Sequence, residues 1–236
     1  MILLGIDFET QGLEASKHWV TEAGVVLWDS EVKQPVRISG FLCKATGGVS
    51  AEITKITGIT NAMLDSHGVE SRPGLQAILA MSRQAQFLVA HNAPFDRGFL
   101  EAWCKREGLE MPAQRWVDTR VDLPIEAYQL GKSRSLKYLA CDTNIMYTAH
   151  RAVSDVLAML EILGKYDIAK TIERALTPNT MVRAVVDFDH RLLARERGYF
   201  WKPETKQWLL QLKENEVELE QEKAPFPVVV VTSNTI

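Results

Sequence analysis

The chain has 236 residues, of which 46% are hydrophobic and 24% are charged, and its formal net charge is −3. These values are typical of a globular chain with a packed core, and they exclude a strongly basic protein that coats nucleic acid. A slightly acidic balance remains compatible with an enzyme that holds phosphate groups through metal ions. The three cysteines, Cys43, Cys104 and Cys141, are isolated in the sequence, which favours a reducing compartment over a disulfide framework.

No stretch approaches the ~20 apolar residues that are needed to cross a bilayer. The apolar run at residues 2–4 is interrupted by Asp7 and is too short for a signal peptide. We therefore expect a cytoplasmic protein without a membrane partner.

The N-terminal part of the chain predicts strands first and alternating helices and strands afterwards. Segments rich in β-branched and aromatic residues predict strands at 2–8, 22–29 and 35–43. Helical apolar spacing follows at 50–60 and 72–84, then a strand at 86–90, a helix at 94–107 and a helix at 150–166. This order predicts an α/β domain with a central mixed β-sheet flanked by helices.

The pattern changes near Pro178. Beyond it the sequence predicts a strand at 182–188, a helix at 189–198, a hairpin at 199–212, an acidic helix at 213–223 and a strand at 227–232. We predict two domains, residues 1–177 and a small α+β domain at residues 178–236. Trp201 and Trp208 flank the hairpin turn among basic residues, and they either form the core of this domain or provide a platform for stacked bases.

Asp7 and Glu9 pose the first chemical question. Residues i and i+2 of a strand share a face, so the two carboxylates lie together while Ile6 and Phe8 point the other way. Two anions this close repel each other unless water separates them or a cation lies between them.

Two further segments carry candidate functional groups. Asp96 follows the predicted strand at 86–90 and begins a helix, where an Asp also favours the helix dipole without any further role. His150 and Asp155 are five residues apart, a net rotation of roughly 140° on a regular helix. Their side chains can converge only if His150 lies on the loop before the helix and Asp155 points inward from the second turn. In the alternative without a joint role, His150 caps the helix or lies on the surface, and Asp155 is solvated.

Together these segments resemble the DnaQ-like, or DEDDh, family of 3′→5′ exonucleases, which belongs to the ribonuclease H-like superfamily. The family motifs are Asp-x-Glu on the first strand, an Asp after a His-Asn-Ala-x-Phe stretch, and His-x-Ala-x-x-Asp. They occur here in that order, at residues 7–9, 91–96 and 150–155. Shorter stretches at 56–60, 118–119 and 135–140 are also similar, and the resemblance covers roughly residues 1–176.

The resemblance implies a two-metal phosphodiester hydrolase. Asp7 would bridge two cations, Glu9 and Asp155 would bind the cation that holds the attacking water, and Asp96 would anchor the second cation through water. His150 matches the family's general base, and its ordinary pKa near 6.5 suits that role. Oxygen ligands of this kind fit two Mg²⁺ ions, with Mn²⁺ as a substitute.

The expected substrate is the 3′ end of DNA, single-stranded or frayed, with release of nucleoside 5′-monophosphates. By position in the family, the pocket for the terminal nucleotide would be lined by Phe8, Thr10, Leu13, Ile59, Asn92 and Phe95. For the apolar members of this set, plain core packing is an equal alternative.

Three alternatives stay open on the sequence alone. RNA-trimming enzymes share these motifs, and no feature here reads the 2′-hydroxyl. A proofreading subunit of a polymerase would carry the same domain, although the C-terminal part is predicted to be folded and not a docking tail. A binding module that has lost catalysis is disfavoured, since all four acids and the histidine are present.

Overall fold

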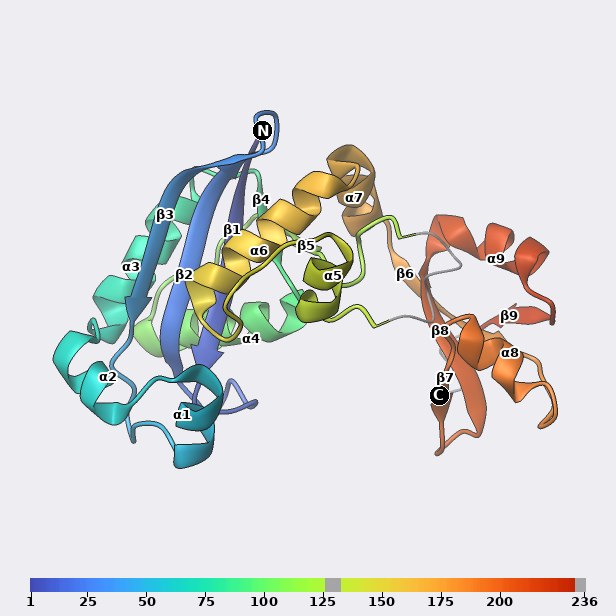
Figure 1. The fold of residues 1–236 in the computed structure, drawn as a ribbon, viewed down its shortest axis with the longest axis horizontal. Helices are drawn as coiled ribbons and strands as arrows, with labels where there is room; N and C mark the ends of the chain where they lie inside the picture. The colour runs from blue at the N-terminus through green and yellow to red at the C-terminus, as the bar shows by residue number, and fades with distance from the viewer. Residues whose placement is uncertain (126–132, 232–236) are drawn as a thin grey trace. The chain divides into compact units, whose positions relative to one another are not determined.

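The computed structural model describes residues 1–125 and 133–231, which form two compact units (Figure 1). The first unit contains residues 1–123 and 134–171, and most of the described part of the second lies at residues 172–231. The predicted domain boundary between residues 177 and 178 stays a prediction. The last residue of the strand predicted at 227–232 lies outside the described residues.

The first unit is built on a five-stranded mixed sheet with the order β3-β2-β1-β4-β5. The antiparallel strands are β1 (Ile2–Thr10), β2 (Val20–Asp29) and β3 (Gln34–Leu42). β4 (Phe87–Ala90) and β5 (Arg115–Asp118) continue the sheet parallel to β1. The predicted α/β fold with a central mixed sheet is therefore confirmed, although β5, whose sequence Arg-Trp-Val-Asp lacks the apolar run of β4, was not recognised from the sequence.

Helices cover both faces of this sheet (Figure 1). α3 (Ser71–Ser82) and α4 (Ala93–Glu107) pack on one face, where the side chains of Ile6 and Phe8 join Ile78 and Trp103 in the main core. α6 (Ala152–Lys165) lies on the other face, next to β1 and β2, with α5 (Leu136–Asp142) beside it. The remaining helices of this part of the chain are α1 (Ala51–Thr57), α2 (Asn61–His67) and α7 (Ile168–Leu176).

Glycines allow α6 to approach the sheet unusually closely. Gly24 lies opposite Asp7 in the β1–β2 pair, and a β-carbon added at Gly24 would collide with the backbone of Ala152 at the start of α6. A β-carbon at Gly5 would lie 2.6 Å from Val156 of the same helix. A side chain at either position would push α6 away, so these glycines set the distance between the first turn of α6 and β1.

The second unit has a four-stranded antiparallel sheet with the order β7-β8-β6-β9. Its elements are β6 (Asn179–Ala184), α8 (Arg191–Glu196), β7 (Phe200–Lys202), β8 (Gln207–Lys213), α9 (Val217–Lys223) and β9 (Val228–Val230). Val182, Leu210 and Tyr199 belong to its own core. The predicted small α+β architecture is present, but the strand predicted at 182–188 is misplaced: β6 spans 179–184, and Asp187 instead accepts a hydrogen bond from the backbone N–H of His190.

Candidate active site

β1 presents two acids to α6. The side chains of Asp7 and Glu9 share the face that α6 covers, while Phe8 between them is only 4% exposed and makes an edge-to-face contact with Trp103 on the opposite face. The alternation expected from the sequence is therefore observed, and it directs both carboxylates toward the first turn of α6.

Asp155 comes from α6 and completes a three-carboxylate cluster. One oxygen of each of Asp7, Glu9 and Asp155 lies within 4.8 Å of the others. His150 lies on the loop before α6, with a positive φ of 65°, and its backbone N–H donates to Asp155 Oδ2 at 2.9 Å. The helix predicted at 150–166 begins later, at Ala152, so His150 meets the condition for convergence that it lies on the preceding loop, and Asp155 lies in the first turn of the helix, not the second. The His150 side chain is exposed.

Asp96 lies beside this cluster but is not one of the three. It is 2% exposed, in the first turn of α4, and its Oδ1 accepts a hydrogen bond from the backbone N–H of Phe8 at 3.0 Å. Its charge contributes to the raised pKa of Asp7. The hydrogen bond to β1 thus holds a fourth carboxylate near Asp7.

The electrostatics of these acids are unfavourable without a cation. Burial, followed by repulsion from Asp96 and Asp155, raises the pKa of Asp7 well above its ordinary value. Burial and Asp155 raise the pKa of Glu9 to about 7, and burial raises the pKa of Asp155 to about 6. Within the described residues no Lys or Arg forms an ion pair with these acids or with Asp96. Hard oxygen ligands of one sign, held this close together, fit a divalent cation.

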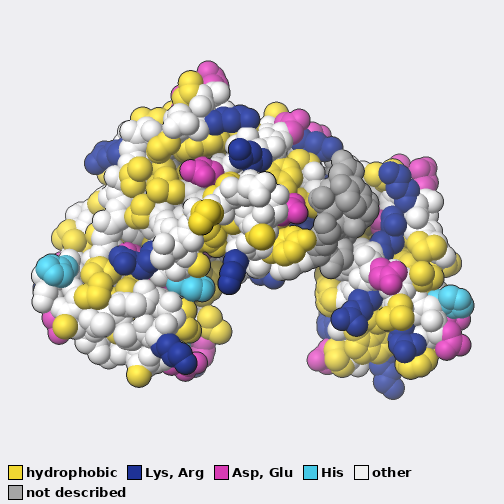
Figure 2. All heavy atoms as spheres, viewed as in Figure 1, with side chains coloured by type: hydrophobic (Ala, Val, Ile, Leu, Met, Phe, Trp, Pro, Cys, Tyr) yellow, Lys and Arg dark blue, Asp and Glu magenta, His cyan; other side chains and the backbone are white. Residues whose placement is uncertain are grey.

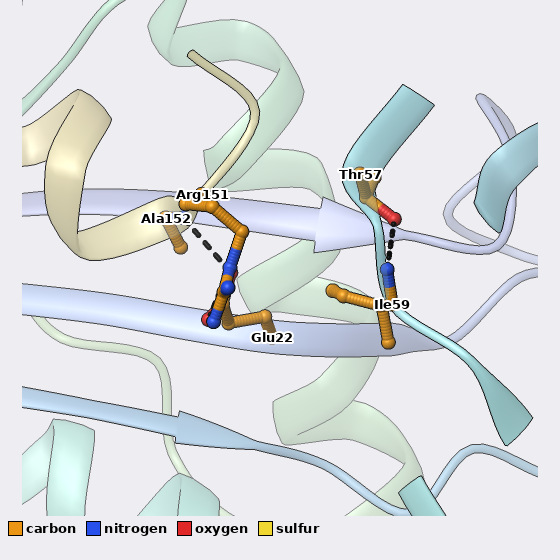
Figure 3. Close-up of polar contacts among 5 residues, drawn as sticks. All are labelled: Glu22, Thr57, Ile59, Arg151 and Ala152. Carbon is orange, nitrogen blue, oxygen red and sulfur yellow. Dashed lines mark hydrogen bonds and ion pairs between the residues drawn. The ribbon is translucent and has the colours of Figure 1, made fainter. Parts of the chain in front are cut away.

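Sequence reasoning missed an ion pair next to the cluster. Glu22 lies opposite Glu9 in the β1–β2 pair and is 6% exposed. Its carboxylate accepts from Arg151 Nε and Nη2, at 3.1 and 2.7 Å, and from the backbone N–H of Ala152 at 3.0 Å (Figure 3). Glu22 therefore fixes both the residue after His150 and the N-terminus of α6. The feature of the sequence that could have indicated this ion pair is Arg151, a basic residue directly after His150.

Asp118, from the family-like stretch at 118–119 to which the sequence analysis assigned no role, supports the loop before α4. Asp118 Oδ1, at the end of β5, accepts from the backbone N–H groups of Asn92 and Arg120, both at 2.9 Å. Asn92 is the N-cap of α4 and has a left-handed backbone, so it depends on this support. Tyr147 lies near enough to the acids to feel their charge: burial, followed by the charges of Asp155 and Asp7, raises its pKa to about 12.

The residues predicted to contact substrate differ in exposure. Ile59 is fully buried, and its backbone N–H donates to Thr57 Oγ1 at 3.1 Å (Figure 3). Thr10 is 7% exposed and donates its hydroxyl to the carbonyl of Gly12, whereas Leu13 is 84% exposed. Phe95 is partly buried and packs against the Phe99 ring. Substrate contact by Phe8, Thr10, Leu13, Ile59, Asn92 and Phe95 stays a prediction.

Comparison with known proteins identifies the family. The model of the RNase_T family, described as an exonuclease, matches residues 4–163. The chain belongs to this exonuclease family. The DnaQ-like, ribonuclease H-like grouping predicted from the three motifs is thereby confirmed, and the family is one of divalent-metal-dependent nucleases. Residues 180–231 match a separate domain family of unknown function.

Curated relatives of similar sequence are PolC-type DNA polymerase III proteins. PolC-type DNA polymerase III of Listeria innocua is 33% identical over 67% of this chain, and that of Thermotoga petrophila is 30% identical over 71%. The chain spans only 11–12% of the length of these relatives.

Solved structures share the fold. E. coli exonuclease I in complex with a dA16 oligonucleotide has a TM-score of 0.62 at 15% identity, over 99% of this chain and 66% of that one. The nuclease domain of 3′hExo, a DEDDh family member bound to rAMP, has a TM-score of 0.57 at 17% identity, over 70% of this chain and 90% of that one.

Every helix in the described part of this chain is too short or too polar to cross a bilayer.

Proposed function

We propose that this exonuclease removes nucleotides from the 3′ end of single-stranded or frayed DNA, using two divalent cations. The observation that carries the proposal is the cluster of Asp7, Glu9 and Asp155: one oxygen of each lies within 4.8 Å of the others, and within the described residues no Lys or Arg forms an ion pair with them. Asp96, hydrogen-bonded to β1, lies beside it. Four acids this close together, with no ion pair to a Lys or Arg in the described part of the chain, suggest ligands for a cation.

Each acid has a distinct proposed role. Asp7 would contact both cations, Glu9 and Asp155 would complete one site, and Asp96 would anchor the other. Cations bound there supply Lewis acidity to the phosphoryl group and make water more acidic, and Mg²⁺ is the proposed ion because all donors are carboxylate oxygens.

His150 is the proposed general base. Its imidazole accepts the proton of the attacking water while the water oxygen forms a bond to phosphorus. The bond between phosphorus and the 3′-oxygen breaks, that oxygen takes up a proton, and a nucleoside 5′-monophosphate leaves. Two features support this role: the backbone N–H of His150 donates to Asp155, which keeps the residue next to the cluster, and its exposed side chain can exchange a proton with solvent.

Glu22 is a proposed positioning residue. Its hydrogen bonds to Arg151 and Ala152 fix the backbone on which His150 and Asp155 depend. We expect it to act only through that backbone, since its carboxylate is already occupied by Arg151.

The proposal is tested with three substrates labelled at the 5′ end: single-stranded DNA, duplex DNA and single-stranded RNA. Each is incubated with the full chain in Mg²⁺ and in EDTA, next to the Asp155→Asn variant. A ladder that shortens from the 3′ end of single-stranded DNA, only in Mg²⁺ and only without the substitution, is the expected result. Preferential trimming of RNA would replace DNA as the substrate, and degradation in EDTA would contradict the metal mechanism.

The PolC-type relatives support proofreading as a second candidate function. A proofreading enzyme removes a mismatched 3′ nucleotide from a primer–template faster than a matched one, because the mismatched end frays more readily. Equal rates on matched and mismatched primer ends would favour a self-standing nuclease for single strands.

A further inference from the structure

The two tryptophans of the second unit have different environments. They face each other across the β7–β8 pair, with ring centroids 5.5 Å apart. Trp208 packs against the core of this unit, whereas Trp201 is 45% exposed and does not belong to that core. Core packing therefore accounts for Trp208 and leaves an exposed aromatic ring at Trp201.

A groove of about 570 Å³ lies next to this pair, within the range of roughly 300–1,000 Å³ that is typical of ligand pockets. Its other wall is the segment between β6 and α8. There Phe188 is 74% exposed, and the Arg191 guanidinium lies 3.7 Å from the centre of the Phe188 ring. Exposed aromatic rings thus line both sides of the groove.

Most of the charged side chains that line the groove are basic. Arg183, Arg191 and Lys206 line it, and among its described lining residues Asp187 is the single acid. Asp187 is already engaged, because its Oδ1 accepts from the His190 N–H and lies 2.7 Å from His190 Nδ1. Figure 2 shows Lys and Arg side chains next to hydrophobic ones on the face of this unit that carries α8 and the β7–β8 hairpin.

From this combination we infer that the groove binds an unpaired nucleic-acid strand, with bases stacked on Trp201 and on the face of Phe188 that Arg191 does not cover, and phosphates held by Arg183, Arg191 and Lys206. Aromatic faces accept any base, and basic side chains follow the backbone, so the site does not read sequence. A duplex, whose bases are already stacked on each other, cannot use the aromatic faces. The site is separate from the carboxylate cluster and needs no metal ion.

Binding is tested on the full chain in EDTA with a fluorescent circular oligothymidylate of about 30 nucleotides, long enough for several single-strand binding sites. A circle has no 3′ end, so it measures the groove independently of the proposed exonuclease activity. Trp201→Ala should weaken binding about 5- to 150-fold, the range expected for one stacked base. The matched control is Phe200→Ala, which removes a half-exposed aromatic from the neighbouring position of β7 that does not line the groove.

Arg183→Gln and Arg191→Gln test the phosphate contacts. Each should lower the slope of log K against log salt by about 0.7, the value for one phosphate contact of a single strand. Arg195→Gln, an exposed change on α8 that does not line the groove, should leave the slope unchanged. These two variants also keep the proposal testable if Trp201→Ala does not fold.

Absence of binding to the circle, equal losses in Trp201→Ala and Phe200→Ala, or equally tight binding of a duplex circle would overturn the proposal. Equal binding of circular oligothymidylate and oligouridylate supports it, because neither stacking nor phosphate contact depends on the sugar. Asp155→Asn should still bind the circle. Loss of hydrolysis with retained circle binding therefore separates the exonuclease site from the groove.

Discussion

The two units bury acids in opposite ways. In the second unit, Glu220 is 5% exposed and accepts from Arg197 Nε and Nη2, at 2.7 and 2.8 Å, and from the Tyr199 hydroxyl at 3.1 Å. In the first unit, Asp7 and Asp96 are held close together, and within the described residues neither forms an ion pair with an arginine. The charge of Glu220 is thus balanced by the chain itself, whereas the charges of Asp7 and Asp96 are left for a cation from outside.

Glu22 sharpens this contrast because it lies next to the unpaired acids. It resembles Glu220, with a bidentate arginine and a further hydrogen-bond donor, yet it sits directly opposite Glu9. The chain therefore places a paired acid and unpaired acids on neighbouring strands. The difference between them is a difference in role, not in burial alone.

The largest effect is expected for the unpaired acids. Asp7→Asn should abolish hydrolysis, because the amide lacks the negative charge that a divalent cation requires, and the fold should remain because a repulsive charge is removed. The measurement is the rate of 3′ trimming in Mg²⁺ together with the thermal midpoint of the metal-free protein. Glu220→Gln is the matched control, and it should lower the midpoint without abolishing hydrolysis. An active Asp7→Asn variant would contradict the proposed role of the cluster.

The next largest effect is expected for His150. His150→Gln should lower the rate by roughly 10²–10⁴-fold, the usual contribution of a general base. Binding of Mn²⁺, measured by isothermal titration, should persist because His150 is not a proposed ligand. If the folded variant no longer binds Mn²⁺, His150 belongs with the metal ligands instead.

A smaller effect on the rate is expected for Glu22. Glu22→Gln should lower kcat by up to about 10²-fold, since displacement of catalytic groups by about an ångström has costs of this size. Glu22→Gln should destabilise the protein less than Glu220→Gln, because the Arg151 side chain is 45% exposed and the Arg197 side chain only 19%. A lower kcat in the less destabilised variant would separate the two acids. Equal kcat values in these two variants would show that Glu22 serves the fold alone.

The smallest effect is a dependence of stability on pH. The pKa of Glu9 is raised to about 7 in the folded protein, so between its ordinary value and 7 the folded state binds more protons than the unfolded state. The contribution of Glu9 to the free energy of unfolding of the metal-free protein should therefore be highest below about pH 4.5 and should fall as the pH rises to 7. Denaturant titrations across this range, with and without Mg²⁺, check the sign. In Mg²⁺ the fall should disappear, and a rise with pH in EDTA would contradict the raised pKa.

Features of the site that depend on neighbouring residues could be predicted from the sequence, and features that depend on distant residues could not. The common face of Asp7 and Glu9 follows from strand alternation, whereas the apolar pattern started the helix at His150 and only the structure placed that residue on the loop before α6. Sequence patterns did not reveal β5, and they misplaced β6, whose end depends on pairing with β8 and β9. They also could not separate the exposed Trp201 from the packed Trp208, because both flank the same turn.

The sequence by itself determined most of the longer elements of the first unit, the order of the acidic motifs and the exonuclease family, since each depends on neighbouring residues or on ordered spacing along the chain. Only the tertiary structure decided that Glu22 faces Glu9 and holds Arg151, a residue 129 positions away. The loop between β1 and β2 spans residues 11–19, and a connection of this length does not fix strand register as a two-residue turn would. Gly24, which appears unremarkable in the sequence, proved to be the contact point of α6, because close approach of two backbones is a property of packing and not of local pattern.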